Sequence, residues 1–238
     1  MLKPEGRLVI GTENRYAIKY ICGDRDPYTN HNFDGIENYR RLSAADRDSI
    51  AGRCYSMAEL KSMLGQAGFD NDKFYSVMPS LQETQLVYAE GYEPVEELAM
   101  RYFPLYNYPD SVFLEEQYLY TDLIKNGMFH KMANAYIIEC SMDGQLDDTL
   151  HATISLDRGH DNALVTSICE HDGVRNVIKR AVYKEGIHKL KEMQDNLNDL
   201  HARGINVVDS SVENNTFVMP YVDAVSYTHL RAHETRGN

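Results

Sequence analysis

The sequence predicts an α/β fold in its first part and an α+β fold in its last part. Three observations support this prediction. The apolar run Leu8–Ile10 is typical of a strand buried on both faces. An amphipathic helical pattern covers residues 56–69. Strand-like segments separated by turn residues follow at 72–92 and again at 151–183.

Composition narrows the class of protein. The 238 residues carry a formal net charge of −12, which argues against a nucleic-acid-binding protein because phosphate affinity comes from clustered Lys and Arg. No apolar run reaches the length of a membrane-spanning helix, and the amino terminus lacks the layout of a secretory signal. The four cysteines are widely spaced and form no C-x-x-C pair. We therefore expect a cytoplasmic protein without disulfides and without a membrane span.

Residues 1–92 form the first predicted unit. A helix is predicted at 14–23 and a loop at 24–53, where turn residues are frequent. Ser56 and Glu59 have the S-x-x-E spacing of a capping box at the start of the next helix, and Gly68 is placed to end it. The segments 72–80 and 84–92 read as an antiparallel strand pair.

The rest of the chain divides into three segments. Residues 93–149 are predicted to be an aromatic-rich connecting region with a helix at 111–125 and a strand at 134–142. Residues 150–224 are predicted to form strands at 151–157, 162–170 and 175–183, a helix at 184–203, and strands at 205–210 and 216–222. Residues 225–238 break with this pattern, and "VSYTHLRAHETRGN" resembles translated sequencing adapter, which predicts a non-native tail.

The first unit resembles a known family. "LKPEGRLVI" is similar to the turn and fifth strand of class I S-adenosylmethionine-dependent methyltransferases, "SMAELKSMLGQAGF" to the helix after it, and the 72–92 pair to the strands that finish that Rossmann-like sheet. The stretch from Ile10 to Arg41 also resembles a bacterial subgroup associated with surface-polysaccharide synthesis. The resemblance implies methyl transfer to a small-molecule or glycan acceptor. Polar residues after an inner strand bind ligands in open α/β sheets, so Glu13 and Asn14 are candidate substrate-binding residues; a solvated strand end is the simpler alternative.

The resemblance covers only the late strands of that fold. No G-x-G pattern occurs in the sequence, so no residue corresponds to the family's cofactor loop. We therefore expect this chain to be an interior piece of a longer bacterial protein that binds S-adenosylmethionine elsewhere, and to be inactive by itself. A half-sheet leaves an apolar edge and face uncovered, which predicts self-association.

The unit at 150–224 resembles the amino-terminal lobe of kinase-like phosphotransferases of the choline-kinase or lipopolysaccharide-core-kinase type. Lys179 would then be the phosphate-contacting lysine on the third strand, Glu192 or Glu185 its helix partner, and residues 219–221 the hinge beside the adenine of ATP. An exposed lysine near an acidic helix is the alternative. The sequence contains no H-R-D or D-F-G segment, so a phosphotransferase or a nucleotide-binding pseudokinase fragment stays a second hypothesis and a non-catalytic interaction module a third.

Other clusters are assigned no chemistry. Residues 169–172 (Cys, Glu, His, Asp) alternate between the two faces of a strand and cannot converge on one metal ion, so they indicate a hairpin turn. The tyrosines of residues 102–120 could stack on sugar rings, but such a set more often packs between domains.

Overall fold

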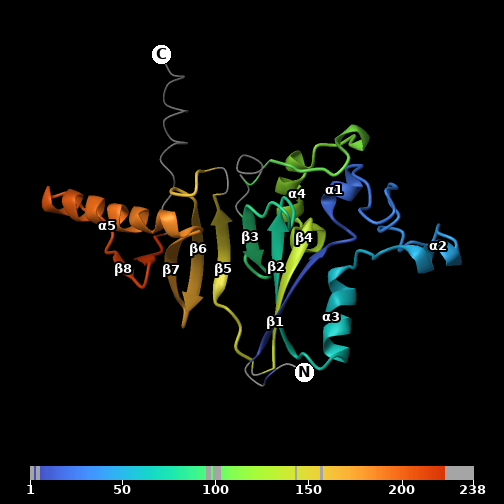
Figure 1. Ribbon diagram of the computed structural model, residues 1–238, viewed down its shortest axis with the longest axis horizontal. Helices are drawn as coiled ribbons and strands as arrows, with labels where there is room; N and C mark the ends of the chain where they lie inside the picture. The colour runs from blue at the N-terminus through green and yellow to red at the C-terminus, as the bar shows by residue number, and fades with distance from the viewer. Residues whose placement is uncertain are drawn as a thin grey trace, which may run out of the picture.

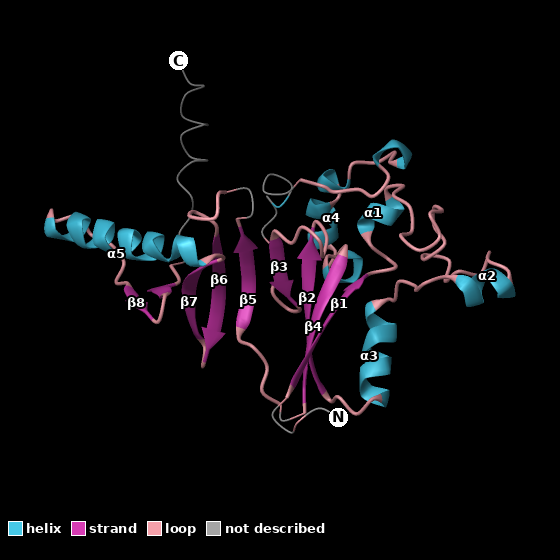
Figure 2. Ribbon diagram, in the orientation of Figure 1, coloured by secondary structure: helices cyan, strands magenta, loops and turns pink. Residues whose placement is uncertain are grey.

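A computed structural model describes residues 3, 6–94, 98, 103–142, 144–155 and 158–222. Its centre is one open sheet of nine strands in the order β1-β4-β2-β3-β5-β6-β7-β9-β8, and every neighbouring pair is antiparallel (Figures 1 and 2). The mixed α/β class is therefore confirmed at this coarse level. The predicted tail at 225–238 lies outside the described residues.

The elements of the first half are β1 (Arg7–Glu13), α1 (Ile18–Ile21), α2 (Ala44–Ser49), α3 (Met57–Gln66), β2 (Asn71–Met78) and β3 (Leu86–Ala89). Those of the middle are η2 (Pro109–Ser111), η3 (Glu116–Tyr118), α4 (Tyr120–Lys125), η4 (His130–Met132) and β4 (Ala135–Ser141). Those of the last part are β5 (Thr149–Ile154), β6 (Leu164–His171), β7 (Val174–Ala181), η5 (Lys184–Gly186), α5 (Ile187–Ala202), β8 (Ser211–Glu213) and β9 (Thr216–Pro220).

The position of β4 sets the topology of the first half. This strand belongs to the segment predicted to be a connection, yet it lies between β1 and β2 and pairs antiparallel with both. Ile138, for example, is the partner of Ile10 on one side and of Phe74 on the other. Two strands antiparallel to the same neighbour run parallel to each other. β1 and β2 therefore run in the same direction on either side of β4, without pairing with each other, and their connection contains α3. Their carboxyl ends therefore lie at one edge of the sheet.

The two halves share the sheet. We expected two separate sheets, but β3 pairs with β5 through Leu86↔Thr153 and Tyr88↔His151, which extends one sheet across both predicted units. Without β5, the outer edge of β3 would leave its backbone groups unpaired. The expected 72–92 strand pair is confirmed as the antiparallel pair of β2 and β3.

Helix α3 begins as the sequence predicts. Ser56 accepts a hydrogen bond from the Glu59 backbone N–H at 3.3 Å, and the Glu59 carboxylate accepts one from the Ser56 N–H at 2.8 Å. The two bonds satisfy donors that the helix itself leaves unpaired, so the capping box is confirmed. Leu60 and Leu64 then face the sheet, where they pack with Phe74, Tyr136 and Ile138.

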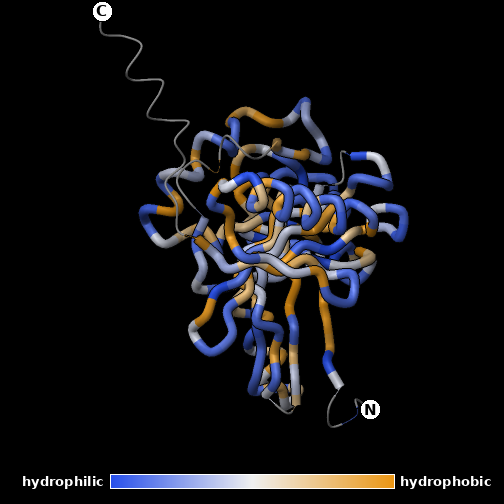
Figure 3. The backbone as a smooth tube through the Cα atoms, turned by 90° about the vertical axis from the view of Figure 1, so that its left-hand side faces the viewer, coloured by the Kyte–Doolittle hydropathy of each residue, from blue (hydrophilic) through white to orange (hydrophobic). Residues whose placement is uncertain are grey.

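The two faces of the sheet differ. One face packs against the helices through two core clusters, and Met78, Leu86, Tyr120 and Phe129 lie in one of them. The other face carries a cluster that, over the described part of the chain, contains strand residues alone: Tyr75, Val87, Ala89, Ile137, Ala152 and Val165. Edge strand β1, drawn largely in the hydrophobic colour in Figure 3, exposes 64% of Val9.

Four predicted elements differ from the structure. The loop expected at 24–53 contains helix α2, whose N-cap Ser43 accepts a hydrogen bond from the Asp46 N–H at 3.1 Å. The helix expected at 14–23 is reduced to α1, because the Asn14 and Arg15 N–H groups donate to the carbonyls of Asn134 and Tyr55. The helix expected at 111–125 is replaced by η2, η3 and α4, because the Phe113 and Leu114 N–H groups both donate to the Cys22 carbonyl. The strand expected at 205–210 is instead β8 at Ser211–Glu213, set by the tight turn that follows it.

Candidate functional site

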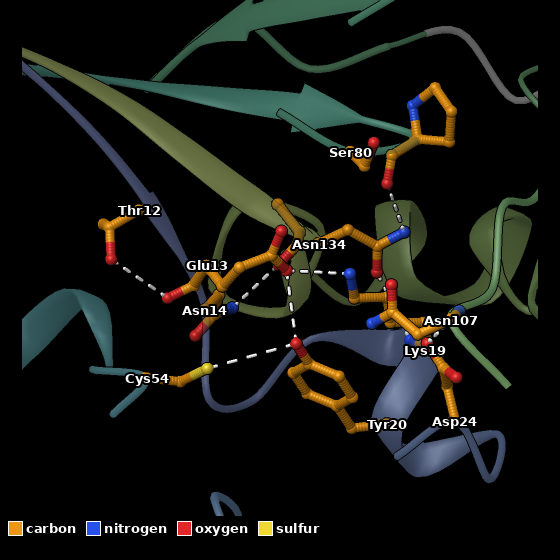
Figure 4. A network of polar contacts seen from close by, with 12 residues as sticks. Thr12, Glu13, Asn14, Lys19, Tyr20, Asp24, Cys54, Ser80, Asn107 and Asn134 are labelled. Atoms are coloured by element: carbon orange, nitrogen blue, oxygen red, sulfur yellow. Dashed lines mark hydrogen bonds and ion pairs between the residues drawn. The ribbon is translucent and has the colours of Figure 1, made fainter. Parts of the chain in front are cut away.

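The candidate site lies at the sheet edge where β1 and β2 end and β4 begins. Glu13 ends β1, Pro79 follows β2, and Asn134 precedes β4 (Figure 4). The carboxyl ends of parallel strands are where open α/β sheets bind ligands.

Glu13 is held by two side chains of α1. Its Oε2 atom lies 2.7 Å from Lys19 Nζ and accepts a hydrogen bond from the Tyr20 hydroxyl at 3.2 Å (Figure 4). The Lys19 side chain is 2% exposed and that of Glu13 14%, so this ion pair is largely withdrawn from water. A buried cation needs such a partner, because an isolated one costs several kcal/mol. The carboxylate is therefore fixed in orientation through one of its two oxygens.

The Asn14 side chain uses its hydrogen-bonding groups within the fold. Its Nδ2 donates to the carbonyls of Lys131 and Ala133, both at 2.9 Å, and its Oδ1 accepts from the Tyr16 N–H at 3.0 Å. The side chain is fully buried. A primary amide has two donor hydrogens, and both are used here. Asn14 thus locks the end of β1 to the segment before β4, and no donor remains for a ligand.

Asn134 ties the other side of the edge together. Its Nδ2 donates to the Pro79 carbonyl at 3.1 Å and to the buried Glu116 carboxylate at 3.2 Å, while its Oδ1 accepts from the Lys19 N–H at 3.3 Å. Both Asn134 and Glu116 are fully buried. Four separate segments of the chain therefore meet at one amide.

A second chain of polar contacts leads from Tyr20 into the loop after α1. The Tyr39 hydroxyl donates to Asp26 Oδ2 at 2.8 Å and accepts from the Cys54 N–H at 2.7 Å. Cys54 Sγ in turn lies 4.0 Å from the Tyr20 hydroxyl. Burial, with the negative charges of Asp26 and Glu13, raises the pKa of the Cys54 thiol to about 12. The thiol is protonated at neutral pH and is not a nucleophile.

The accessible rim of the site is aromatic. Tyr28 is 40% exposed, and its pKa is raised first by burial and then by the charges of Cys54, Glu13 and Asp26. A Cβ atom added to Gly52 would come within 2.6 Å of the Tyr28 ring, so this glycine allows the ring to pack closely. Tyr28 thus presents a partly exposed aromatic ring that packs against Gly52.

The second predicted site is not assembled as a Lys–Glu pair. Lys179 lies on β7 opposite the buried Phe217 of β9, and burial lowers its pKa, as does the positive charge of Arg158. The Glu192 carboxylate instead pairs with Lys189 of the same helix at 2.7 Å. Among the described residues, neither Lys179 nor the other candidate partner, Glu185, takes part in an ion pair. Nucleotide binding by Lys179 and Glu192 stays a prediction.

Lys19, Tyr20, Glu116 and Asn134 are site residues that the sequence did not single out. A polar residue directly before the buried strand 135–141 was a usable signal for Asn134. The contacts of Lys19 and Glu116 bridge more than one segment, so no local pattern reveals them.

The part of the chain that the structure describes contains no candidate metal site and no candidate membrane span. In the ranges described, no three His, Cys, Asp or Glu side chains gather in a way that could hold a metal ion. Nor does any helix of those ranges have the length and apolar character to cross a bilayer.

Comparison with protein families, with curated proteins and with solved structures finds no match for this chain.

Proposed function

We propose that β1, α3, β2 and β4 form the acceptor-side half of a class I S-adenosylmethionine-dependent methyltransferase domain. One observation carries the proposal: β1 and β2 are parallel, α3 lies in their connection, and antiparallel β4 fits between them, with Glu13 at the shared carboxyl edge. Polar groups at such an edge are the usual ligand contacts of open α/β sheets.

No residues of this chain fit the cofactor. The sequence contains no G-x-G turn, and the polar groups of the edge that are described above are bonded to one another. The proposal therefore assigns S-adenosylmethionine binding to a part of a longer protein outside this sequence.

Within this chain, Glu13 is proposed to bind the acceptor. Its free oxygen accepts a hydrogen bond from an acceptor hydroxyl or amine, while Lys19 and Tyr20 hold the other oxygen in place. Asn14 acts as a positioning residue. The partly exposed Tyr28 ring supplies an apolar face on which the C–H groups of a sugar pack, which favours a glycan or a cell-surface polymer precursor.

The test uses the full-length protein. Transfer of a radioactive methyl group from S-adenosylmethionine to an envelope polysaccharide extract is measured for wild type, Glu13→Gln and the control Glu37→Gln, whose carboxylate pairs on the surface with Arg40 and Arg41. We expect Glu13→Gln to lower kcat/KM by about tenfold or more, the loss expected for a hydrogen bond to a charged group, and the control to leave it unchanged. Equal activity of all three proteins, or no transfer by wild type, contradicts the proposal. Micromolar binding of S-adenosylmethionine by the present chain alone contradicts it as well.

A second candidate function rests on the last part of the chain. Strands β5, β6, β7, β9 and β8 pair in that order, α5 lies between β7 and β8 in the sequence, and Lys179 is half-buried on β7. This arrangement supports nucleotide binding by a kinase-like lobe in which Lys179 contacts the phosphates. Calorimetry with ATP tests it: Lys179→Ala is expected to abolish binding and Lys191→Ala, on the exposed side of α5, to preserve it. ATP binding that survives Lys179→Ala excludes this candidate.

A further inference from the structure

A polar concavity lies at the far end of the sheet from the candidate site. It is lined by the carboxyl end of β7, the segment that leads into α5 and the turn between β8 and β9, and its volume is about 320 Å³. This volume is at the small end of the range for ligand pockets. The polar side chains along it are Arg180, Tyr183, Lys184, Asn214, Asn215 and Thr216.

The sheet and its turn fix four of these groups. Arg180 is the register partner of Thr216 on β9, so the two side chains share one face of the sheet. Asn214 and Asn215, with φ values of 48° and 59°, form the two-residue turn closed by the pair Glu213↔Thr216. The guanidinium, a hydroxyl and two amides are therefore brought to the same pocket. Tyr183 stands at its border, stacked on His160 at 4.0 Å.

The pocket is positively charged. Arg180 and Lys184 line it, and no Asp or Glu does. The nearest acidic residues in the sequence, Glu185 and Glu213, are exposed, and among the described residues neither cation is in an ion pair with them. In a chain whose formal net charge is −12, two cations without a carboxylate in one concavity are a local exception. Such a site attracts anions.

We propose that this pocket binds a phosphate-bearing ligand of the diphosphate class. The planar guanidinium of Arg180 matches two phosphate oxygens at once, and Lys184 adds a point charge with three donors. Asn214, Asn215 and Thr216 supply neutral hydrogen bonds at the rim. Adjacent strand residues point to opposite faces, so the pocket is separate from Lys179 and does not depend on either function proposed above.

The test is calorimetric titration of the chain with inorganic pyrophosphate at constant ionic strength. Arg180→Ala/Lys184→Ala removes both cations. The control Lys189→Ala/Lys191→Ala removes the same charge from α5, outside the pocket. We expect one pyrophosphate per chain, affinity at least about tenfold weaker in the pocket variant, and affinity within about twofold of wild type in the control.

A third variant separates site binding from a simple charge effect. Asn215→Gly keeps the positive φ of the turn, since glycine adopts it freely, but removes the amide. We expect about a threefold loss of affinity at unchanged net charge. No binding by wild type, equal weakening by the two double variants, or unchanged affinity in both Arg180→Ala/Lys184→Ala and Asn215→Gly would overturn the proposal.

Discussion

The ammonium nitrogen of Lys19 lies 2.7 Å from Glu13 Oε2, and the lysine side chain is only 2% exposed. The charge of Glu13 is thus tied to a cation that has no access to water. Lys19 also lies over the Tyr20 ring, with its nitrogen 5.1 Å from the ring centre. The pair connects the end of β1 to α1, so it bears on stability as well as on the proposed acceptor contact.

Lys19→Met is expected to lower the free energy of unfolding by about 3 kcal/mol, because it leaves the Glu13 carboxylate largely buried without its cation. Lys61→Met is the matched control: its pair with Glu90 has the same 2.7 Å separation but is 41% and 39% exposed. Such a surface pair contributes about 0–1 kcal/mol. Urea unfolding of both variants measures the difference. Equal losses of unfolding free energy in the two variants would show that burial does not make the Lys19–Glu13 pair more stabilising than a surface pair.

Ser56→Ala is expected to cost about 1 kcal/mol, since it removes the side-chain oxygen that accepts the Glu59 N–H at the start of α3. Ser62→Ala, an exposed position in the same helix, is expected to change stability by less than about 0.5 kcal/mol. The midpoints of chemical denaturation of the two variants give the comparison. A loss for Ser56→Ala no larger than that for Ser62→Ala would mean that the capping box is not stabilising.

Alkaline pH is expected to destabilise the chain. The pKa of Cys54 is raised from its ordinary value of 9.0 to about 12, so between these pH values the unfolded chain loses a proton that the folded chain keeps. The free energy of unfolding then falls as pH rises, by up to about 1.4 kcal/mol per pH unit for this thiol. Below pH 9 its contribution is fully present.

The check is denaturant unfolding at several pH values from 8 to 11 for wild type and Cys54→Ala. The free energy of unfolding of the variant is expected to fall less steeply with pH than that of wild type. The difference between the two slopes is expected to correspond to close to one proton per molecule. Equal slopes of the free energy of unfolding against pH for the two proteins would contradict the assignment of this proton to Cys54. Alkylation gives a second reading: the native Cys54 thiol is expected to react far more slowly than the thiol of the unfolded chain.

Val9→Lys is expected to reduce self-association. Val9 is 64% exposed on edge strand β1, and a charge at such an edge disfavours pairing with another chain. Val174→Lys is the control, because Val174 is similarly exposed, at 61%, but lies on inner strand β7. Light scattering over a concentration series is the measurement. A wild-type chain that stays monomeric throughout would refute the prediction.

Local features of the fold were predictable from the sequence. The capping box at Ser56 and Glu59, the antiparallel pair of β2 and β3 and the hairpin at Asp172-Gly173 each depend on residues close in the chain. The place of β4 between β1 and β2 was not predictable in this way, because its partners are more than 50 residues away. The pairing of β3 with β5, which joins two expected units into one sheet, was not predictable for the same reason: the two strands are far apart in the sequence.

The candidate site was predictable only in part. Glu13 and Asn14 were predicted from the rule that ligands bind beyond the carboxyl ends of inner strands. The structure corrects the premise, because β1 is an edge strand, although Glu13 still ends it. The different roles of Glu13 and Asn14 could not be predicted from the sequence. They depend on contacts with Lys19, Lys131 and Ala133, which the fold brings to this edge of the sheet. The ion pairs of the described residues do not include the expected pair of Lys179 with Glu192; the Glu192 carboxylate pairs instead with Lys189, one turn earlier on α5.

The most direct test of the central claim is long-read sequencing of the source locus across both ends of this reading frame. The proposed methyltransferase half predicts that codons upstream of Met1 encode four further strands and a Gly-rich loop that together complete the cofactor site. A genuine start codon at Met1 and a genuine stop codon after Asn238 would contradict it, because these 238 residues contain no G-x-G turn.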